Sequence, residues 1–120
     1  MRARDELRMQ ATIVAWLRNR GYHPVHMANE YIRSAKQGAI AKREGMEPGV
    51  PDLLIFEVPM GREEDFAGVA MELKTKTGKV SKKQKQWIAR LEQNRWIATV
   101  IRSKEEAVVL LTELGYDRVS

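Results

Sequence analysis

The sequence predicts a mixed α/β domain whose elements follow the order α-β-β-β-α-β-α. Three observations lead to this expectation. The 120 residues suit a single domain, spanning residues 1–120, and leave little room for a second one. Apolar residues recur at helical spacing near the start of the chain, and short apolar runs bounded by turn residues follow. The composition, 43% hydrophobic and 31% charged, is that of an ordinary globular domain.

The first part of the chain should contain a helix, a short strand and a second, broken helix. A helix is expected over residues 5–20, followed by Gly21 as its C′ residue. Residues 22–28 are expected to form a strand that Pro24 keeps short or at an edge. A broken helix is expected around residues 32–42. The apolar positions that recur at spacings of three and four in the first helix are Leu7, Ala11, Val14 and Leu17.

The second part of the chain should supply three strands and two helices. Strands are expected at 50–58 and 68–76, with a loop rich in turn residues and acids between them. A helix at 81–94, a strand at 96–102 and a final helix at 103–115 follow. Capping boxes mark both helix starts and pair Ser81 with Gln84 and Ser103 with Glu106. The strands on either side of the first of these helices should be parallel if they share a sheet.

The charge balance suggests a polyanionic partner such as nucleic acid. The formal net charge is +5 and the pI is about 9.7, although many basic proteins bind nothing acidic. There is no cysteine, so disulfides and thiolate metal sites are excluded. The first ten residues mix both charge signs, and no apolar run approaches the ~18 residues of a membrane span. We therefore expect a soluble, cytoplasmic protein with no membrane partner.

Three charged residues lie on the two strands that should be buried. Side chains at positions i and i+2 of a strand share one face, so Glu72 and Lys74 should point the same way. If the two strands pair as a hairpin, Asp52 lies close to both. Two neighbouring carboxylates repel each other, and a divalent cation such as Mg²⁺, which prefers oxygen ligands, relieves that repulsion. A lysine beside such a site can orient a water or neutralise phosphate charge.

Simpler interpretations of the same residues remain open. Glu72 and Lys74 could form an exposed ion pair on an edge strand, which contributes little to stability. Asp52 follows a proline and could be only a turn residue. The combined spacing P-D-x₁₉-E-x-K favours a metal site over these separate explanations.

The chain resembles a family of nucleases. Pro51-Asp52 and Glu72-Leu73-Lys74 resemble the PD-(D/E)xK signature. The segments KREGMEPGVPDLLI (42–55) and VAMELKTKTGKVSKKQKQWIARL (69–91) are similar to the VRR-NUC branch, the virus-type replication-repair nucleases found in phages and in a eukaryotic repair enzyme. The resemblance covers most of the chain. It implies a restriction-endonuclease-like core, α-β-β-β-α-β, with a mixed central sheet and a C-terminal helix.

The resemblance also implies a site and its cofactor. The cofactor would be Mg²⁺ or Mn²⁺, as one ion or two. Lys74 corresponds to the catalytic lysine. Gln84 corresponds to a glutamine of an S-x-x-Q segment near the site, but its place in a capping box explains it equally well. Glu6 corresponds to the acid that the family carries on its first helix. Gln10 follows Glu6 by one helical turn and either supports the site or packs beside it. The implied metal ligands are Asp52, Glu72, the carbonyl of Leu73, and Glu6, directly or through water.

Two basic stretches are candidates for nucleic-acid binding. One surrounds the end of the second long strand and the next helix start: Lys76, Lys79, Lys82, Lys83 and Lys85. The other comprises Asn29, Arg33, Lys36, Lys42 and Arg43. A solvated helix face is the simpler explanation. Cations at a helix N-terminus oppose the macrodipole, however, and a phosphate bound there would account for them.

The expected function is therefore a metal-dependent DNA endonuclease, acting as a homodimer on a Holliday junction or other branched DNA. A flap or nicking nuclease remains open. So do a catalytically silent DNA-binding module on the same fold and an interaction protein whose basic charge is incidental.

Overall fold

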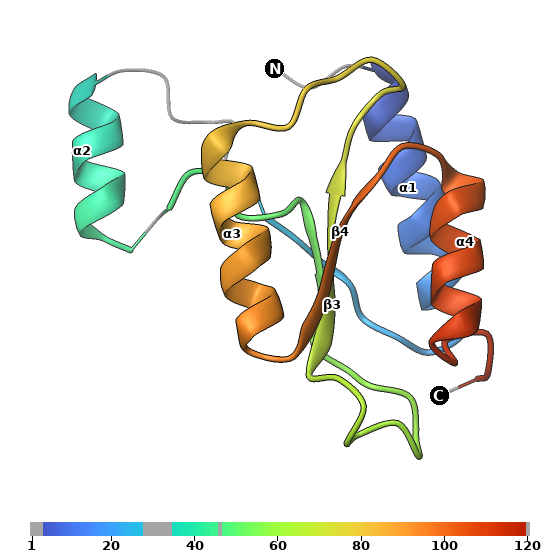
Figure 1. The fold of residues 1–120 in the computed structure, drawn as a ribbon. Helices are drawn as coiled ribbons and strands as arrows, with labels where there is room; N and C mark the ends of the chain where they lie inside the picture. The colour runs from blue at the N-terminus through green and yellow to red at the C-terminus, as the bar shows by residue number, and fades with distance from the viewer. Residues whose placement is uncertain (1–3, 28–34, 46, 120) are drawn as a thin grey trace.

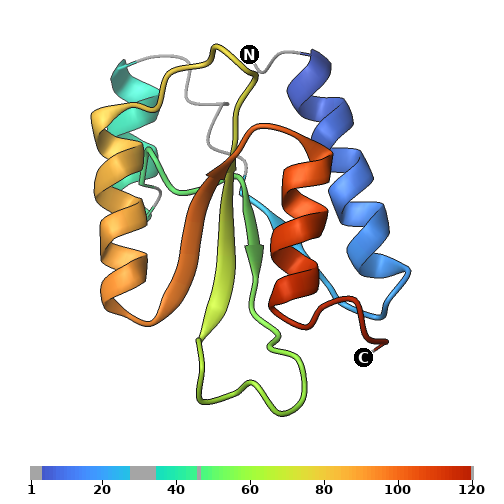
Figure 2. The ribbon, with the colours of Figure 1, turned by 45° about the vertical axis from the view of Figure 1, so that its right-hand side comes forward.

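The computed structural model describes residues 4–27, 35–45 and 47–119, which form a central sheet with helices on both faces (Figures 1 and 2). The four strands lie in the order β1-β2-β3-β4. Their bounds are Val25–His26 for β1, Leu53–Ile55 for β2, Gly68–Leu73 for β3 and Trp96–Ile101 for β4. The pairs β1–β2 and β2–β3 are antiparallel, whereas β3–β4 is parallel. The predicted mixed sheet and the parallel pair are confirmed.

Helices cover the two faces of the sheet unequally. On one face, α1 (Arg4–Arg18) and α4 (Lys104–Glu113) pack on a core that includes Met71 and Leu73 of β3. On the other face, α3 (Lys82–Gln93) packs on a smaller cluster around Leu54, Ala70 and Ala98. The short helix α2 (Ala35–Arg43) lies on the α3 side of the molecule in both views. None of the described helices is long and apolar enough to cross a membrane.

The buried face of α1 is not the row of apolar positions that indicated the helix. Leu17 belongs to both, but its buried partners are Met9 and Ile13. Leu7 is 48% exposed, and Ala11 is exposed as well. Both rows have helical spacing, and only the position of α4 and the sheet decides which row is covered.

The strands β2 and β3 are shorter than predicted. We expected 50–58 and 68–76, whereas the ladder between them joins Leu53 with Met71 at one end and Ile55 with Val69 at the other. Beyond Ile55 the chain leaves the sheet, and Phe56 is 59% exposed. Before Leu53, a side chain takes over the pairing, as described below. The short ladder limits where the charged residues can lie.

Three helices begin at the same end of the molecule. Figure 2 shows the starts of α1, α3 and α4 around the carboxyl end of β3. Ser81 caps α3 through a complete capping box. Ser103 caps α4 by accepting from the Glu106 N–H at 3.1 Å, which is one half of the second predicted box. Helix starts carry a partial positive charge, so this end of the sheet favours anions.

A close backbone contact holds the segment before β2 against α3. Gly49 has a φ of +92°, and a Cβ at this position would lie 2.7 Å from the backbone carbon of Lys83. Only glycine adopts this conformation readily and also leaves room for α3. The contact places the start of β2 next to the first turn of α3.

We predict that Gly49→Ala destabilises the protein more than Gly61→Ala does. Gly61 also has a positive φ, +91°, but a Cβ there would meet nothing within 4 Å. The control should lower the free energy of unfolding by about 1–2 kcal/mol, the strain of a left-handed alanine. Gly49→Ala should lose about 1–3 kcal/mol more because it also overpacks the contact with α3. Urea unfolding measures both, and equal losses would contradict the proposed contact.

Candidate active site

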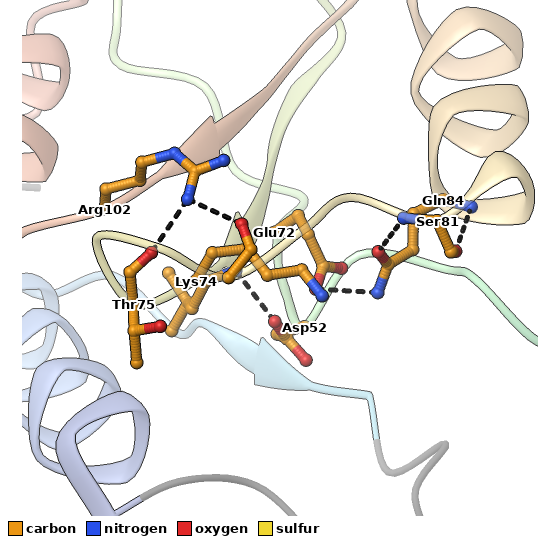
Figure 3. A network of polar contacts seen from close by, with 9 residues as sticks. Asp52, Glu72, Lys74, Thr75, Ser81, Gln84 and Arg102 are labelled. Carbon is orange, nitrogen blue, oxygen red and sulfur yellow. Dashed lines mark hydrogen bonds and ion pairs between the residues drawn. The ribbon is translucent and has the colours of Figure 1, made fainter.

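Asp52 extends the β2–β3 pairing by one residue through its side chain. Its Oδ2 accepts a hydrogen bond from the Leu73 backbone N–H at 2.8 Å (Figure 3). Its own carbonyl accepts from the Met27 N–H at 2.8 Å, which ties it to the end of β1. Among the described residues no hydrogen bond reaches Oδ1 of this carboxylate. Asp52 is therefore a fixed acid with one oxygen left for a ligand.

Glu72 and Lys74 point the same way, as the i and i+2 rule predicts. The Nζ atom of Lys74 lies 3.8 Å from Oε2 of Glu72. The Glu72 residue is only 3% exposed, and the Lys74 side chain is 17% exposed. Because both are largely removed from water, the interpretation as a solvated edge-strand pair is wrong. A buried carboxylate beside an ammonium group is a costly arrangement that is common at functional sites.

Gln84 serves the helix cap and the acid at the same time. Its Oε1 accepts from the Ser81 N–H at 2.8 Å, and its backbone N–H donates to the Ser81 hydroxyl at 3.1 Å. Its Nε2 donates to Oε2 of Glu72 at 3.1 Å. One side chain therefore completes the cap and contacts Glu72, and Figure 3 shows it between Ser81 and Glu72. A role of Gln84 in an active site stays a prediction.

Arg102 is a residue that the sequence analysis missed. Its Nη1 donates to the carbonyls of Thr75 and Gly78, both at 2.8 Å, and lies 3.4 Å from that of Lys76. One guanidinium thus holds the loop that follows β3. A signal for Arg102 was available in the sequence. Arg102 comes at the end of the strand predicted at 96–102, which should run parallel to the strand that carries Glu72. Parallel strands end at the same edge of a sheet, so Arg102 could have been placed near Glu72.

The two acids form a donor set that suits a hard divalent cation. Mg²⁺ commonly takes one or two carboxylates and fills its remaining positions with water and phosphate. Among the described residues, no group of three or more His, Cys, Asp or Glu side chains could hold a metal ion. Glu6 thus does not complete a three-acid cluster with Asp52 and Glu72, and its role through water stays a prediction. So do the role of the Leu73 carbonyl and that of Gln10.

The basic residues predicted to bind nucleic acid lie partly around this site. All five lysines of the first stretch are exposed, on the loop after β3 and the first turn of α3: Lys76, Lys79, Lys82, Lys83 and Lys85. Lys42 and Arg43 are exposed in the last turn of α2. Asn29 and Arg33 lie outside the described residues, and so does the side chain of Lys36.

The architecture, a four-stranded mixed sheet with a C-terminal helix, is a nuclease-type fold. The model of the VRR-NUC domain family matches residues 3–105, and the chain belongs to this family. The chain is also similar to a solved structure of a VRR_NUC domain protein, with a TM-score of 0.76 and 16% identity, over 100% of this chain and 99% of that one. No curated protein matches it.

We predict that Gln84→Glu destabilises the metal-free protein although it keeps the capping box. Glutamate accepts from the Ser81 N–H as well as glutamine does, but it replaces the donor to Glu72 by a second carboxylate. The free energy of unfolding should fall by about 1–3 kcal/mol, the scale for leaving a buried polar group without its partner. Added Mg²⁺ should recover part of this loss by relieving the repulsion between the carboxylates.

Ser81→Ala is the matched control for this experiment. It removes half of the cap, at a cost of about 1 kcal/mol, and leaves the contact between Gln84 and Glu72 in place. Mg²⁺ should therefore stabilise this variant and the parent protein equally and leave the difference between them unchanged. Thermal or urea unfolding with and without Mg²⁺ compares the two variants. If Gln84→Glu is as stable as the parent protein, the amide does nothing for Glu72.

Proposed function

We propose that this protein is a divalent-metal-dependent DNA endonuclease that hydrolyses phosphodiester bonds. The observation that carries the proposal is the convergence of Asp52, Glu72 and Lys74 at the carboxyl end of β3, with Glu72 buried. The family is nuclease-like, and a nuclease domain suggests DNA as the substrate. The net charge of +5 and the exposed lysines beside the site agree with such a substrate.

Asp52 and Glu72 are the residues that would hold the metal, with Mg²⁺ or Mn²⁺ as the ion. When bound, a divalent ion supplies a water of lowered pKa and neutralises charge on the phosphate. The Leu73 N–H keeps the Asp52 carboxylate in place, and the amide of Gln84 does the same for Glu72. Gln84 is in this sense a positioning residue. Glu6 would act through water.

Lys74 is the proposed catalytic cation. Its ammonium group lies beside Glu72, within 3.8 Å, where it can orient the attacking water and screen the negative charge that develops on the phosphate. A preformed charge in a site with little water is worth more than the same charge at the surface. No covalent intermediate is required.

The lysines at the start of α3 would bind the DNA backbone. The first turn of α3 contains no acid, whereas the first turns of α1 and α4 contain two acids each. Lys82 and Lys83 oppose the macrodipole of α3. A backbone phosphate at this position would interact favourably with both the lysines and the helix start.

We further propose that the enzyme is specific for DNA structure and works as a homodimer in replication, recombination or repair. A Holliday junction offers two symmetric cuts, and one chain carries one site; two-fold symmetry is the common arrangement of small oligomers. The deciding experiment is a panel of linear, flap, nicked and four-way DNAs with Mg²⁺, Mn²⁺ or EDTA, with light scattering on the same samples. Binding without cleavage in either metal would favour the silent DNA-binding module.

We predict that Asp52→Asn and Glu72→Gln abolish metal-dependent cleavage and leave the fold intact. In the first variant the amide oxygen of the asparagine would still accept from the Leu73 N–H, so the isosteric changes remove charge and little else. Loss of a residue that only supports a metal ligand lowers activity by up to about 100-fold. Loss of a ligand itself should therefore lower cleavage by more than this. The stabilisation of the protein by Mg²⁺ should also disappear. Normal cleavage by either variant in Mg²⁺ would contradict the assignment of Asp52 and Glu72 as metal ligands.

We predict opposite effects for Lys74→Ala and for the pair Lys82→Ala with Lys83→Ala. Lys74→Ala should lower the single-turnover rate by roughly 10²-fold or more and change DNA binding little. The pair should weaken binding and reduce the salt slope by roughly 0.9 per lost phosphate contact on duplex DNA, while the rate at saturation survives. If Lys74→Ala weakens binding and cuts normally at saturation, Lys74 only belongs to the basic surface.

A further inference from the structure

A cavity of about 410 Å³ lies beside the proposed site, on the side away from α3. Its walls come from three segments that are distant in sequence: the first turns of α1, the loop that follows β3, and the start of α4. A volume of this size falls within the range of small-ligand sites. The mechanism above uses one of its lining residues, Lys74.

The cavity is strongly basic. Four cations besides Lys74 line it: Arg8, Lys76, Arg102 and Lys104. Asp5 and Glu105 are its two acids, so the basic side chains outnumber the acidic ones by five to two. The hydroxyl-bearing residues Thr12, Thr75 and Ser103 complete the polar lining. Such an excess of donors and positive charge suits a phosphate group.

The wall of the cavity is fixed before any ligand binds. Arg102 donates to the carbonyls of Thr75 and Gly78 at 2.8 Å, and this holds the loop that carries Lys76. Figure 3 shows Arg102 and Thr75 next to Lys74 and on the opposite side of it from Gln84. A preformed wall lowers the entropy lost on binding.

Lys74 connects the cavity with the two acids. It lines the cavity, and its Nζ lies 3.8 Å from Glu72. A phosphate in the cavity therefore lies close to the phosphate being cut. The lysines of α3 lie on the other side of the acids, so the two basic surfaces flank the reaction site.

We infer that this cavity is a second phosphate-binding subsite, which takes a backbone phosphate of the cleaved DNA strand within two nucleotides of the cut. The inference rests on the proposed nuclease function. A strand would run from the start of α3, across Asp52 and Glu72, into the cavity. Arg8 and Lys104 contact the phosphate, whereas Arg102 acts as a positioning residue for the loop.

The test compares two charge-matched double variants. Arg8→Ala with Lys104→Ala removes two exposed cations of the cavity. Arg18→Ala with Arg118→Ala removes two exposed cations, one at the last residue of α1 and one near the C-terminus. Figure 2 shows the end of α1 and the C-terminus at the opposite end of the molecule from the helix starts. On a DNA that the parent protein cuts, the cavity variant should bind at least about tenfold more weakly near 0.1 M salt, with the salt slope reduced by about 0.9 for the one phosphate contact that is lost. The control should lose well under half as much affinity, and it should cut at the parent rate when saturated.

Singly neutralised phosphates locate the contact. The substrate is prepared with one methylphosphonate at each of the three positions on either side of the cut. The parent protein should lose affinity at one of the two positions nearest the cut on one side, and the cavity variant should show no further loss there. Glu105→Gln should change the DNA affinity in the opposite direction. It should tighten binding, because it removes an acid from the lining of the cavity.

The results separate the subsite from the nuclease function. Equal losses in the two double variants, or a cavity variant that keeps the full methylphosphonate penalty, overturn the subsite while cleavage by the parent protein upholds the function. If the parent protein neither binds nor cuts any DNA of the panel, the function fails and the subsite fails with it.

Discussion

The hydrogen bond from the Leu73 N–H to the Asp52 carboxylate is the interaction on which the site geometry depends. The backbone ladder between β2 and β3 joins only three residue pairs, too few to fix what lies beyond it. A side-chain oxygen continues the pairing at 2.8 Å and so holds Asp52 next to the strand that carries Glu72. The same bond orients the carboxylate. Gly49 packs against the backbone of Lys83 and keeps the segment before β2 close to α3.

The three helix starts at this end of the molecule differ in the charge of their first turns. The helices α1 and α4 begin with acids in their first turns, which favour the positive end of the macrodipole. The helix α3 begins with Lys82 and Lys83, which oppose it by roughly 0.3–1 kcal/mol for each exposed charge. Between these starts lies Glu72, with 3% exposure. The unfavourable charges are thus concentrated around the two acids, as expected where a charged ligand binds.

The sequence predicted the parts of the site that depend on local rules. The i and i+2 rule and a hairpin pairing brought Glu72 and Lys74 together with Asp52, and the capping box located the start of α3. Spacing alone does not decide which face of α1 is buried, because Leu7 and Met9 both fit helical spacing and only α4 and the sheet decide between them. The cavity was missed for a related reason: Arg8, Lys76 and Lys104 come from segments that meet only in the folded chain, and no local pattern marks them.

The residue type at position 84 shows how the fold and the site constrain each other. A capping box accepts either glutamate or glutamine at this position, because only an acceptor is needed for the Ser81 N–H. The neighbouring Glu72 needs a donor, and the Nε2 of Gln84 supplies it at 3.1 Å. Glutamine satisfies both requirements and glutamate only one. With Arg102 holding Thr75 and Gly78 at the other end, the basic loop between β3 and α3 is fixed at both ends. The backbone that carries the lysines of this loop is therefore held in place before any ligand binds, and binding need not order it.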